Sequence, residues 1–158
     1  MLYHRWEYSV TADETTVIQP DGCRDLILVS RRGEPDLIRM TEWDSRPQMV
    51  HLQAGTELIG YRLSPGTTIA STVLADGEPS SAALEDLIES EVAQNSEIFE
   101  LIETLAQSNA TVEQVARQSG RTARTLQRQF RDLSLPTPDY WRLLGRARRS
   151  VKALPWLG

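Results

Sequence analysis

The first half of the chain alternates short apolar runs with turn-forming residues. Proline fixes its own φ and glycine accepts left-handed conformations, so clusters of these residues predict turns between strands. Strands at this spacing, with no helical periodicity between them, predict an antiparallel sheet arranged as a sandwich or a small barrel. The predicted strands contain residues 17–18, 26–29, 37–38, 49–52 and 58–63, and the turns lie at 20–22, 32–35, 46–47 and 65–66.

Helical periodicity replaces this pattern after the turn at residues 76–79. Leu84, Leu87 and Ile88 recur at helical spacing, and a second apolar stripe begins near Ser96. The two stripes predict a helical hairpin over residues 79–109. Its apolar faces could pack on the sheet or pair with a second copy of the chain, and the sequence leaves both alternatives open.

Two short helices are predicted between residues 111 and 133. Thr111 and Gln114 have the spacing of a capping box, which satisfies backbone N–H groups at the start of a helix. Gly120 suits the left-handed conformation that follows a helix end. Thr122 then caps a second helix over residues 123–133. A short glycine turn between two such helices is typical of a helix-turn-helix.

The second of these helices has two distinct faces. Leu126, Phe130 and Leu133 share one face and are expected to be buried, whereas a polar, basic stripe occupies the other. On an exposed helix such a stripe can enter the major groove, where Arg pairs with guanine and Gln with adenine. The expected base contacts are Arg124, Gln127 and Arg128. An ordinary amphipathic helix with a solvated basic face is the alternative.

A third helix is predicted after Thr137, the N-cap, with Pro138 at its first position. Its apolar stripe consists of Tyr140, Leu143, Leu144, Ala147, Val151 and Leu154. Arginines on its other faces could contact phosphates, which strengthens DNA binding without selecting a sequence. The expected phosphate contacts of the whole segment are Arg121, Thr125, Arg131, Arg142 and Arg146.

Charge is distributed unevenly along the chain, whose net charge is −5. Residues 1–108 contain 7 Arg, no Lys and 19 acidic residues, a balance of −12. Residues 109–158 contain 10 basic and 3 acidic residues, a balance of +7. This asymmetry indicates that the basic part meets a polyanion, although charge clusters also occur merely as solvated surfaces.

These residues resemble a known family. VEQVARQSGRTARTLQRQFRDL followed by TPDYWRLLGRARR is similar to the first helix-turn-helix and the connecting helix of AraC-type bacterial transcription regulators. QPDGCRDLILVS and GYRLSPG resemble the uncharacterised domain that precedes this unit in many bacterial members. The resemblance implies a transcription factor that binds double-stranded DNA, with base contacts from the exposed face carrying Arg124, Gln127 and Arg128.

The chain departs from the family pattern at two places. Leu135-Pro136 replaces the usual glycine-containing turn, and the sequence reaches Gly158 where a second helix-turn-helix should begin. A natural truncation, a fragment and a relic that senses without binding DNA are all compatible with this pattern. A single reading head makes few contacts, so strong specific binding would need a homodimer or an additional DNA-binding segment.

The expected architecture is therefore α+β. It comprises a β-rich sensor domain at residues 1–78, the hairpin at 79–109 for linkage or dimerisation, and a helix-turn-helix unit at 110–158. The densest polar group of the first domain is a candidate effector or redox site for an unidentified small molecule. Its members are Asp21, Cys23, Arg24 and Arg62. An ordinary turn at Pro20-Asp21-Gly22 is the alternative.

Other classes of function find less support in the sequence. His51 and Glu57 faintly resemble a cupin metal motif, but His4 is the only other histidine, so we expect neither a metal site nor a cofactor. No nucleophile has a recognisable catalytic context, and we expect no enzyme. One cysteine and no long apolar segment predict a cytoplasmic protein that does not enter a membrane. A small-molecule sensor or protein-interaction module with a non-functional helix-turn-helix is the alternative to a regulator.

Overall fold

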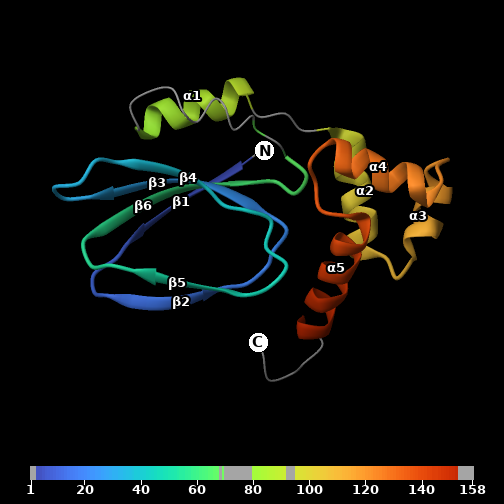
Figure 1. The fold of residues 1–158 in the computed structure, drawn as a ribbon, viewed down its shortest axis with the longest axis horizontal. Helices are drawn as coiled ribbons and strands as arrows, with labels where there is room; N and C mark the ends of the chain where they lie inside the picture. Colours follow the sequence, from blue (N-terminus) through green and yellow to red (C-terminus); the bar gives the residue numbers. More distant parts are fainter. Residues whose placement is uncertain (1–2, 68, 70–79, 92–94, 153–158) are drawn as a thin grey trace. The chain divides into compact units, whose positions relative to one another are not determined.

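Antiparallel strands come first in the chain and helices follow, which confirms the predicted α+β class (Figure 1). The computed structural model describes residues 3–67, 69, 80–91 and 95–152. The strands are β1 (Tyr3–Ser9), β2 (Glu14–Ile18), β3 (Arg24–Arg31), β4 (Leu37–Met40), β5 (Gln48–Leu52) and β6 (Thr56–Leu63). The helices are α1 (Ser81–Glu91), α2 (Ser96–Gln107), α3 (Val112–Gln118), α4 (Ala123–Asp132) and α5 (Pro138–Lys152).

Four strands form one antiparallel sheet in the order β1-β6-β3-β4, and β2 pairs with β5 in a second sheet. Neither sheet closes into a barrel within the described residues. The predicted apolar runs lie in β2 to β6. The sequence pattern does not predict β1, because Tyr3–Ser9 mixes aromatic and charged side chains without a clean apolar alternation.

Helix α1 covers one face of the four-stranded sheet. Side chains alternate between the faces of a strand, so β3 and β6 each turn every second residue toward this helix. The packed residues are Leu26, Leu28, Tyr61, Leu63, Leu84 and Ile88. The Tyr61 hydroxyl also bonds to the side chains of Ser81 and Glu85, each at 2.8 Å. Sheet β2-β5 lies on the other side of the four-stranded sheet (Figure 1).

The chain divides into two compact units, residues 1–94 and 95–158. This division falls within the segment 79–109, for which the sequence predicts a hairpin. Helix α1 instead belongs to the first unit, because its apolar stripe packs on the sheet, whereas α2 belongs to the second. Asn95 caps α2 by accepting a hydrogen bond from the Ile98 backbone N–H at 3.2 Å. The expected boundary at residues 78 and 79 lies outside the described residues.

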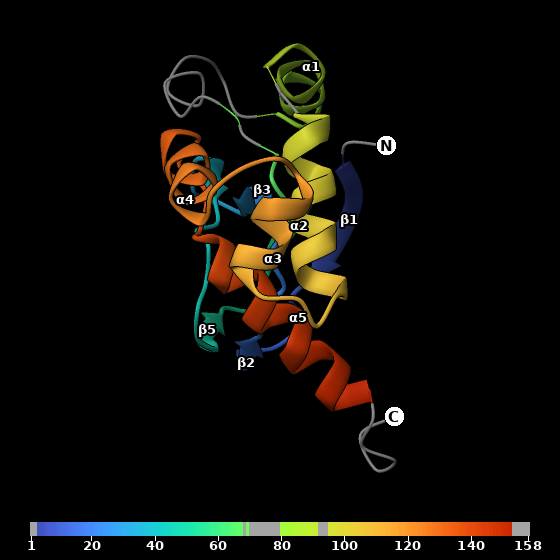
Figure 2. The same cartoon turned by 90° about the vertical axis from the view of Figure 1, so that its right-hand side faces the viewer.

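Helices α2 to α5 share one core in the second unit (Figure 2). Each contributes the apolar side of an amphipathic helix, as the sequence pattern indicates for α2, α3 and α4. The buried core residues are Ile98, Leu101, Ile102, Leu105, Val112, Val115, Ala116, Leu126, Phe130, Leu135 and Trp141. Leu133, which was expected to be buried, caps the end of α4 and is only half-buried.

The apolar stripe predicted for α5 is wrong. Leu143 and Val151 are 48% and 51% exposed, and the inward side instead carries Trp141 and Gly145. The reason is the close approach of α5 to α2: a Cβ atom on Gly145 would lie 1.9 Å from the Ala106 carbonyl oxygen. A contact line that runs through a glycine has no apolar side chain to reveal it in the sequence. Leu154 lies outside the described residues.

Arg149 strengthens the same contact between α5 and α2. Its guanidinium donates to the carbonyl oxygens of Ala106 and Ser108. The last carbonyl groups of a helix lack intrahelical partners, so this arginine caps the C-terminal end of α2.

Candidate nucleic-acid interface

Local hydrogen bonds define the starts of α3 and α4. Thr111 Oγ1 accepts from the Gln114 N–H at 3.3 Å, while Gln114 Oε1 accepts from the Thr111 N–H at 2.8 Å. This confirms the predicted capping box. Thr122 Oγ1 accepts from the Thr125 N–H at 3.2 Å and caps α4, also as predicted. Both helices therefore begin at the residues that the sequence specifies.

The ends of α3 and α4 use the same left-handed turn. Gly120 has φ 70° after α3, and Ser134 has φ 55° after α4. In each case the next backbone N–H bonds to a carbonyl five residues earlier, which satisfies the helix end. These bonds are Arg121 to Ala116 at 2.8 Å and Leu135 to Phe130 at 2.9 Å. The second turn thus forms without the glycine usual in the resembled family, because Ser134 adopts the required conformation.

Helix α4 buries one side and exposes the other. Leu126 and Phe130 are fully buried, which fixes the rotation of the helix about its axis. The opposite side exposes Arg124, Gln127 and Arg128 together with Arg131. These four side chains and Thr125 line a hollow of about 560 Å³. The three expected base-contacting residues therefore lie together on an accessible surface, which we call the α4 face.

The cations of the α4 face are available for an external anion. No carboxylate in the described part of the chain pairs with Arg124 or Arg128. Arg131 lies 3.9 Å from Asp132, but its side chain is 77% exposed and such surface pairs contribute little. Several unneutralised guanidinium groups on one surface produce a positive potential that attracts anions.

The expected phosphate contacts fall into two groups. Arg131 and Arg146 are exposed, and Thr125 lies half-buried beside the α4 face. Arg142, by contrast, bonds to Asp139 at 2.9 Å with its side chain 22% exposed. The Arg121 guanidinium likewise bonds within the molecule, to the Ser119 carbonyl oxygen and the Glu97 carboxylate. The structure therefore leaves Arg131 and Arg146 accessible, while Arg121 and Arg142 make intramolecular contacts.

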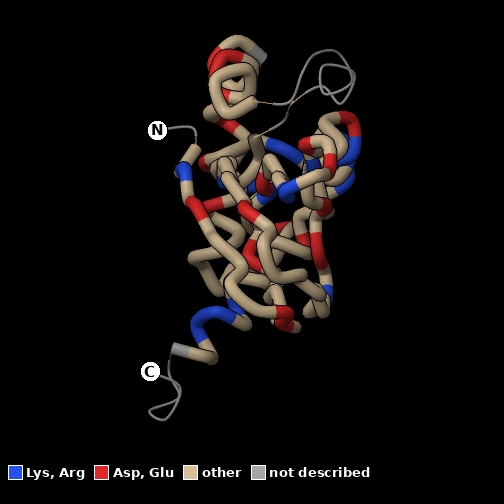
Figure 3. The backbone as a smooth tube through the Cα atoms, turned by 90° about the vertical axis from the view of Figure 1, so that its left-hand side faces the viewer, with Lys and Arg blue, Asp and Glu red and all other residues tan. Residues whose placement is uncertain are grey.

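Further basic residues lie outside the predicted set. Arg117 is exposed on α3, and the C-terminal half of α5 is rich in arginine (Figure 3). Nothing in the periodicity of α3 distinguishes Arg117 from a solvated side chain. Its exposure just before the turn adds one more cation to the surface of the helix-turn-helix.

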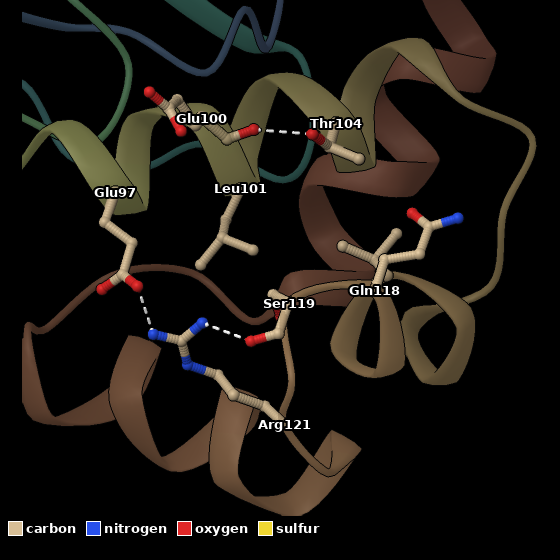
Figure 4. A pocket seen from close by; sticks show the side chains of 8 residues that line it. Glu97, Glu100, Leu101, Thr104, Gln118, Ser119 and Arg121 are labelled. Atoms are coloured by element: carbon tan, nitrogen blue, oxygen red, sulfur yellow. Dashed lines mark hydrogen bonds and ion pairs between the residues drawn. The ribbon is translucent and has the colours of Figure 1, made fainter.

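Arg121 turns inward toward α2, where it faces a small cavity (Figure 4). Its guanidinium donates to the Ser119 carbonyl oxygen at 3.0 Å and to the Glu97 carboxylate. The hydrogen bond from Arg121 lowers the pKa of Glu97 below its usual range, and the Gln129 side chain contributes in the same direction. The cavity has a volume of about 300 Å³, and Leu101 and Val115 are among its lining residues.

A separate polar cluster lies in the first unit, on the sheet face opposite α1. Arg62 Nε bonds to Asp25 Oδ1 at 3.2 Å, and its terminal nitrogens bond to Asp25 Oδ2 at 3.2 Å and Asp21 Oδ2 at 3.1 Å. Trp6 Nε1 donates to Asp25 at 2.9 Å. The bonds to Asp25 raise the pKa of the Arg62 guanidinium. Two carboxylates thus neutralise the one guanidinium.

This cluster matches the candidate effector or redox site only in part. Asp21 and Arg62 are in contact, and the Cys23 backbone N–H donates to Asp21 Oδ1 at 2.9 Å. Arg24 is directed elsewhere, because it stacks on Trp43 and donates to the Thr41 carbonyl oxygen at 2.9 Å. Asp25 takes the central position. Alternation along β3 separates Arg24 from Asp25, so adjacency in sequence is a poor guide here.

Replacement of Asp25 with alanine is expected to destabilise the first unit by roughly 1–3 kcal/mol, since it leaves the Trp6 N–H and the Arg62 guanidinium without their main acceptor. Urea unfolding followed by circular dichroism measures this loss. Glu34→Ala, which removes a surface partner of Arg31, is the control and should cost under about 1 kcal/mol. Equal effects of the two substitutions would contradict a structural role for Asp25.

No group of three or more His, Cys, Asp or Glu side chains in the described residues is arranged to hold a metal ion. His51 instead shares a hydrogen bond with Thr15 at 2.7 Å. Among the helices of the described residues, none has both the length and the apolar character that crossing a bilayer requires.

Comparisons with protein families, curated proteins and solved structures found no match for this chain.

Proposed function

We propose that this chain is a sequence-specific, DNA-binding transcription regulator of AraC-like type that reads the major groove with α4. One observation carries the proposal: Arg124, Gln127 and Arg128 are exposed together on a helix whose opposite side is buried. A rigid helix with an exposed, unneutralised basic side has the shape and charge that the major groove accepts.

The chemistry of the α4 face supports base recognition beyond general attraction. An arginine fork can donate two hydrogen bonds to guanine, and a glutamine amide can both donate to and accept from adenine. Residues three and four apart lie side by side on a helix, so Arg124, Gln127 and Arg128 can address neighbouring base pairs. Arg131 and Arg146 are suited to the flanking phosphates because both are exposed.

The remaining features of the proposal follow from this role. One reading helix contacts few base pairs, so we propose that two copies bind as a homodimer. The first unit would carry an effector-responsive function, without catalysis. A cytoplasmic location would give the protein access to DNA. Each of these statements depends on DNA binding by the intact chain.

Selection of duplexes from a random pool at moderate salt tests the proposed function. We expect enrichment of a short sequence, and a measured mass of the complex that corresponds to two chains per duplex. Thermal-shift measurements against a panel of metabolites should accompany the selection. Stabilisation by a metabolite, with no binding of any duplex at low salt, would favour a sensor module over a regulator.

Replacement of Arg146 with alanine is expected to weaken binding to all duplexes alike and to reduce the slope of log K against log salt by about one. The physical reason is the loss of one phosphate contact and the counterion release that accompanies it. Fluorescence anisotropy over a salt series measures both effects. Arg32→Ala removes an exposed arginine of the first unit and should leave the slope unchanged. An unaltered slope for Arg146→Ala would exclude the phosphate contact.

A further inference from the structure

We infer that Glu97 and Arg121 are positioning residues for the proposed reading helix, and that Arg121 serves this role in place of a phosphate contact. The Glu97 carboxylate, at the start of α2, holds the turn that precedes α4 through its bond to Arg121. This inference rests on the proposed DNA-binding function and adds to it the device that orients and could regulate the α4 face.

The contacts of Arg121 tie the turn to two helices. Its backbone N–H completes the end of α3, while its guanidinium bonds to the Ser119 carbonyl oxygen and to Glu97 (Figure 4). Its side chain is 22% exposed. Thr122, the next residue, is the N-cap of α4. Arg121 therefore fixes the backbone one residue before the reading helix begins.

Gln129 of α4 lies near the same carboxylate and, after Arg121, contributes to the lowered pKa of Glu97. The Gln129 Oε1 atom is buried and has no hydrogen-bond partner among the described residues. The Glu97 carboxylate thus contacts the turn directly through Arg121 and lies near the inner side of α4.

Apolar packing alone does not specify this arrangement. Leu101 of α2 and Val115 of α3 are buried, and both also line the hollow of about 300 Å³ that Arg121 adjoins. Apolar contacts have no preferred direction, whereas a guanidinium fork fixes the orientation of its partners. The polar bridge therefore adds a directional constraint on the turn relative to α2 to the constraint from apolar packing.

The position of Glu97 also indicates how binding could be regulated. Helix α2 is the first element of the second unit, and Glu97 lies in its first turn. The chain therefore enters the second unit through the turn that carries Glu97. A displacement of this turn would break the bond from Arg121 to Glu97 and loosen the segment that precedes α4.

The substitution Glu97→Gln distinguishes a positioning role of Arg121 from a phosphate contact, because the two roles predict opposite changes in affinity for DNA. A positioning role predicts that affinity for the selected duplex falls roughly threefold to tenfold, because the Arg121 bridge loses its charged partner. A phosphate-contact role predicts equal or tighter binding, because Arg121 is freed and a negative charge is removed. Glu103→Gln removes the same charge from an exposed position of α2 and is the matched control.

A charge exchange supplies the second test. Arg121→Glu alone should weaken binding to the selected duplex roughly tenfold or more, and Glu97→Arg in the same chain should restore most of the affinity with the salt dependence unchanged. Arg121→Glu combined with Glu103→Arg has the same net charge but lacks the pair, and it should remain weak. Circular dichroism of each variant shows whether it is folded. If Arg121→Glu does not fold, the affinity of Glu97→Gln decides between the positioning role and the phosphate contact.

The outcomes distinguish failure of the inference from failure of the proposed function. Binding by the unsubstituted chain, together with equal or tighter binding by Glu97→Gln or an exchange that restores nothing, would overturn the inference alone. Failure of the unsubstituted chain to bind any duplex at low salt would overturn the proposed function, and the positioning role with it.

Discussion

Replacement of Arg128 with alanine is expected to weaken binding to the selected duplex by roughly 5- to 150-fold, about 1–3 kcal/mol, and to change binding to random duplex far less. Arg128 is exposed on the α4 face, and no described carboxylate neutralises it. A bidentate contact from Arg128 to guanine can form only on a duplex with guanine at that position, whereas attraction to phosphates is common to all sequences. Anisotropy titrations with both duplexes measure the ratio.

The ratio of the two affinities is the decisive quantity for Arg128. Arg32→Ala serves again as the control for loss of one exposed positive charge. A second selection with the Arg128→Ala protein should also show relaxed preference at one position of the enriched sequence. Equal losses on selected and random duplex would assign Arg128 to the backbone and remove it from base recognition.

Gly145→Ala is expected to destabilise the second unit by roughly 2–4 kcal/mol and to lower its melting temperature by about 10 °C or more. The added Cβ would lie 1.9 Å from the Ala106 carbonyl oxygen, so α5 must move away from α2. Alanine favours a helix over glycine by about 1 kcal/mol, which offsets only part of this cost. Thermal unfolding followed by circular dichroism measures the result.

Ala147→Leu is the matched control for this substitution. Ala147 is exposed on the same helix, and leucine adds more volume than the change from glycine to alanine while retaining high helix propensity. Its effect should stay within about 0.5 kcal/mol. Stability of Gly145→Ala equal to that of the unsubstituted chain would show that α5 and α2 are not in close contact at this residue.

Local rules predict much of the second unit from the sequence. The capping box at Thr111, the cap at Thr122 and the turn at Gly120 depend on residues within a few positions of each other, so the sequence specifies them directly. The faces of α4 follow from helical periodicity in the same way. These features place Arg124, Gln127 and Arg128 on an exposed surface.

Features that depend on distant partners are not predictable in this way. Whether α1 packs on the sheet or on α2 depends on which apolar surface it meets, and both helices have suitable stripes. The inward side of α5 is determined by Ala106, and the orientation of Arg121 by Glu97. A glycine at a helix crossing and an arginine paired with a remote carboxylate have no signature in their own neighbourhoods.

Helix α2 contains no lysine or arginine, yet it contacts an arginine at each end, Arg121 at its first turn and Arg149 at its last. Its first turn is joined through Glu97 to Arg121 in the turn that precedes α4, and its last turn contacts Arg149 and Gly145 of α5. The length of α2 therefore sets the separation between the α4 face and Arg146, although α2 itself is not proposed to contact DNA. Under the proposed function, a longer or shorter α2 would change which base pair the α4 face and which phosphate Arg146 can contact at the same time.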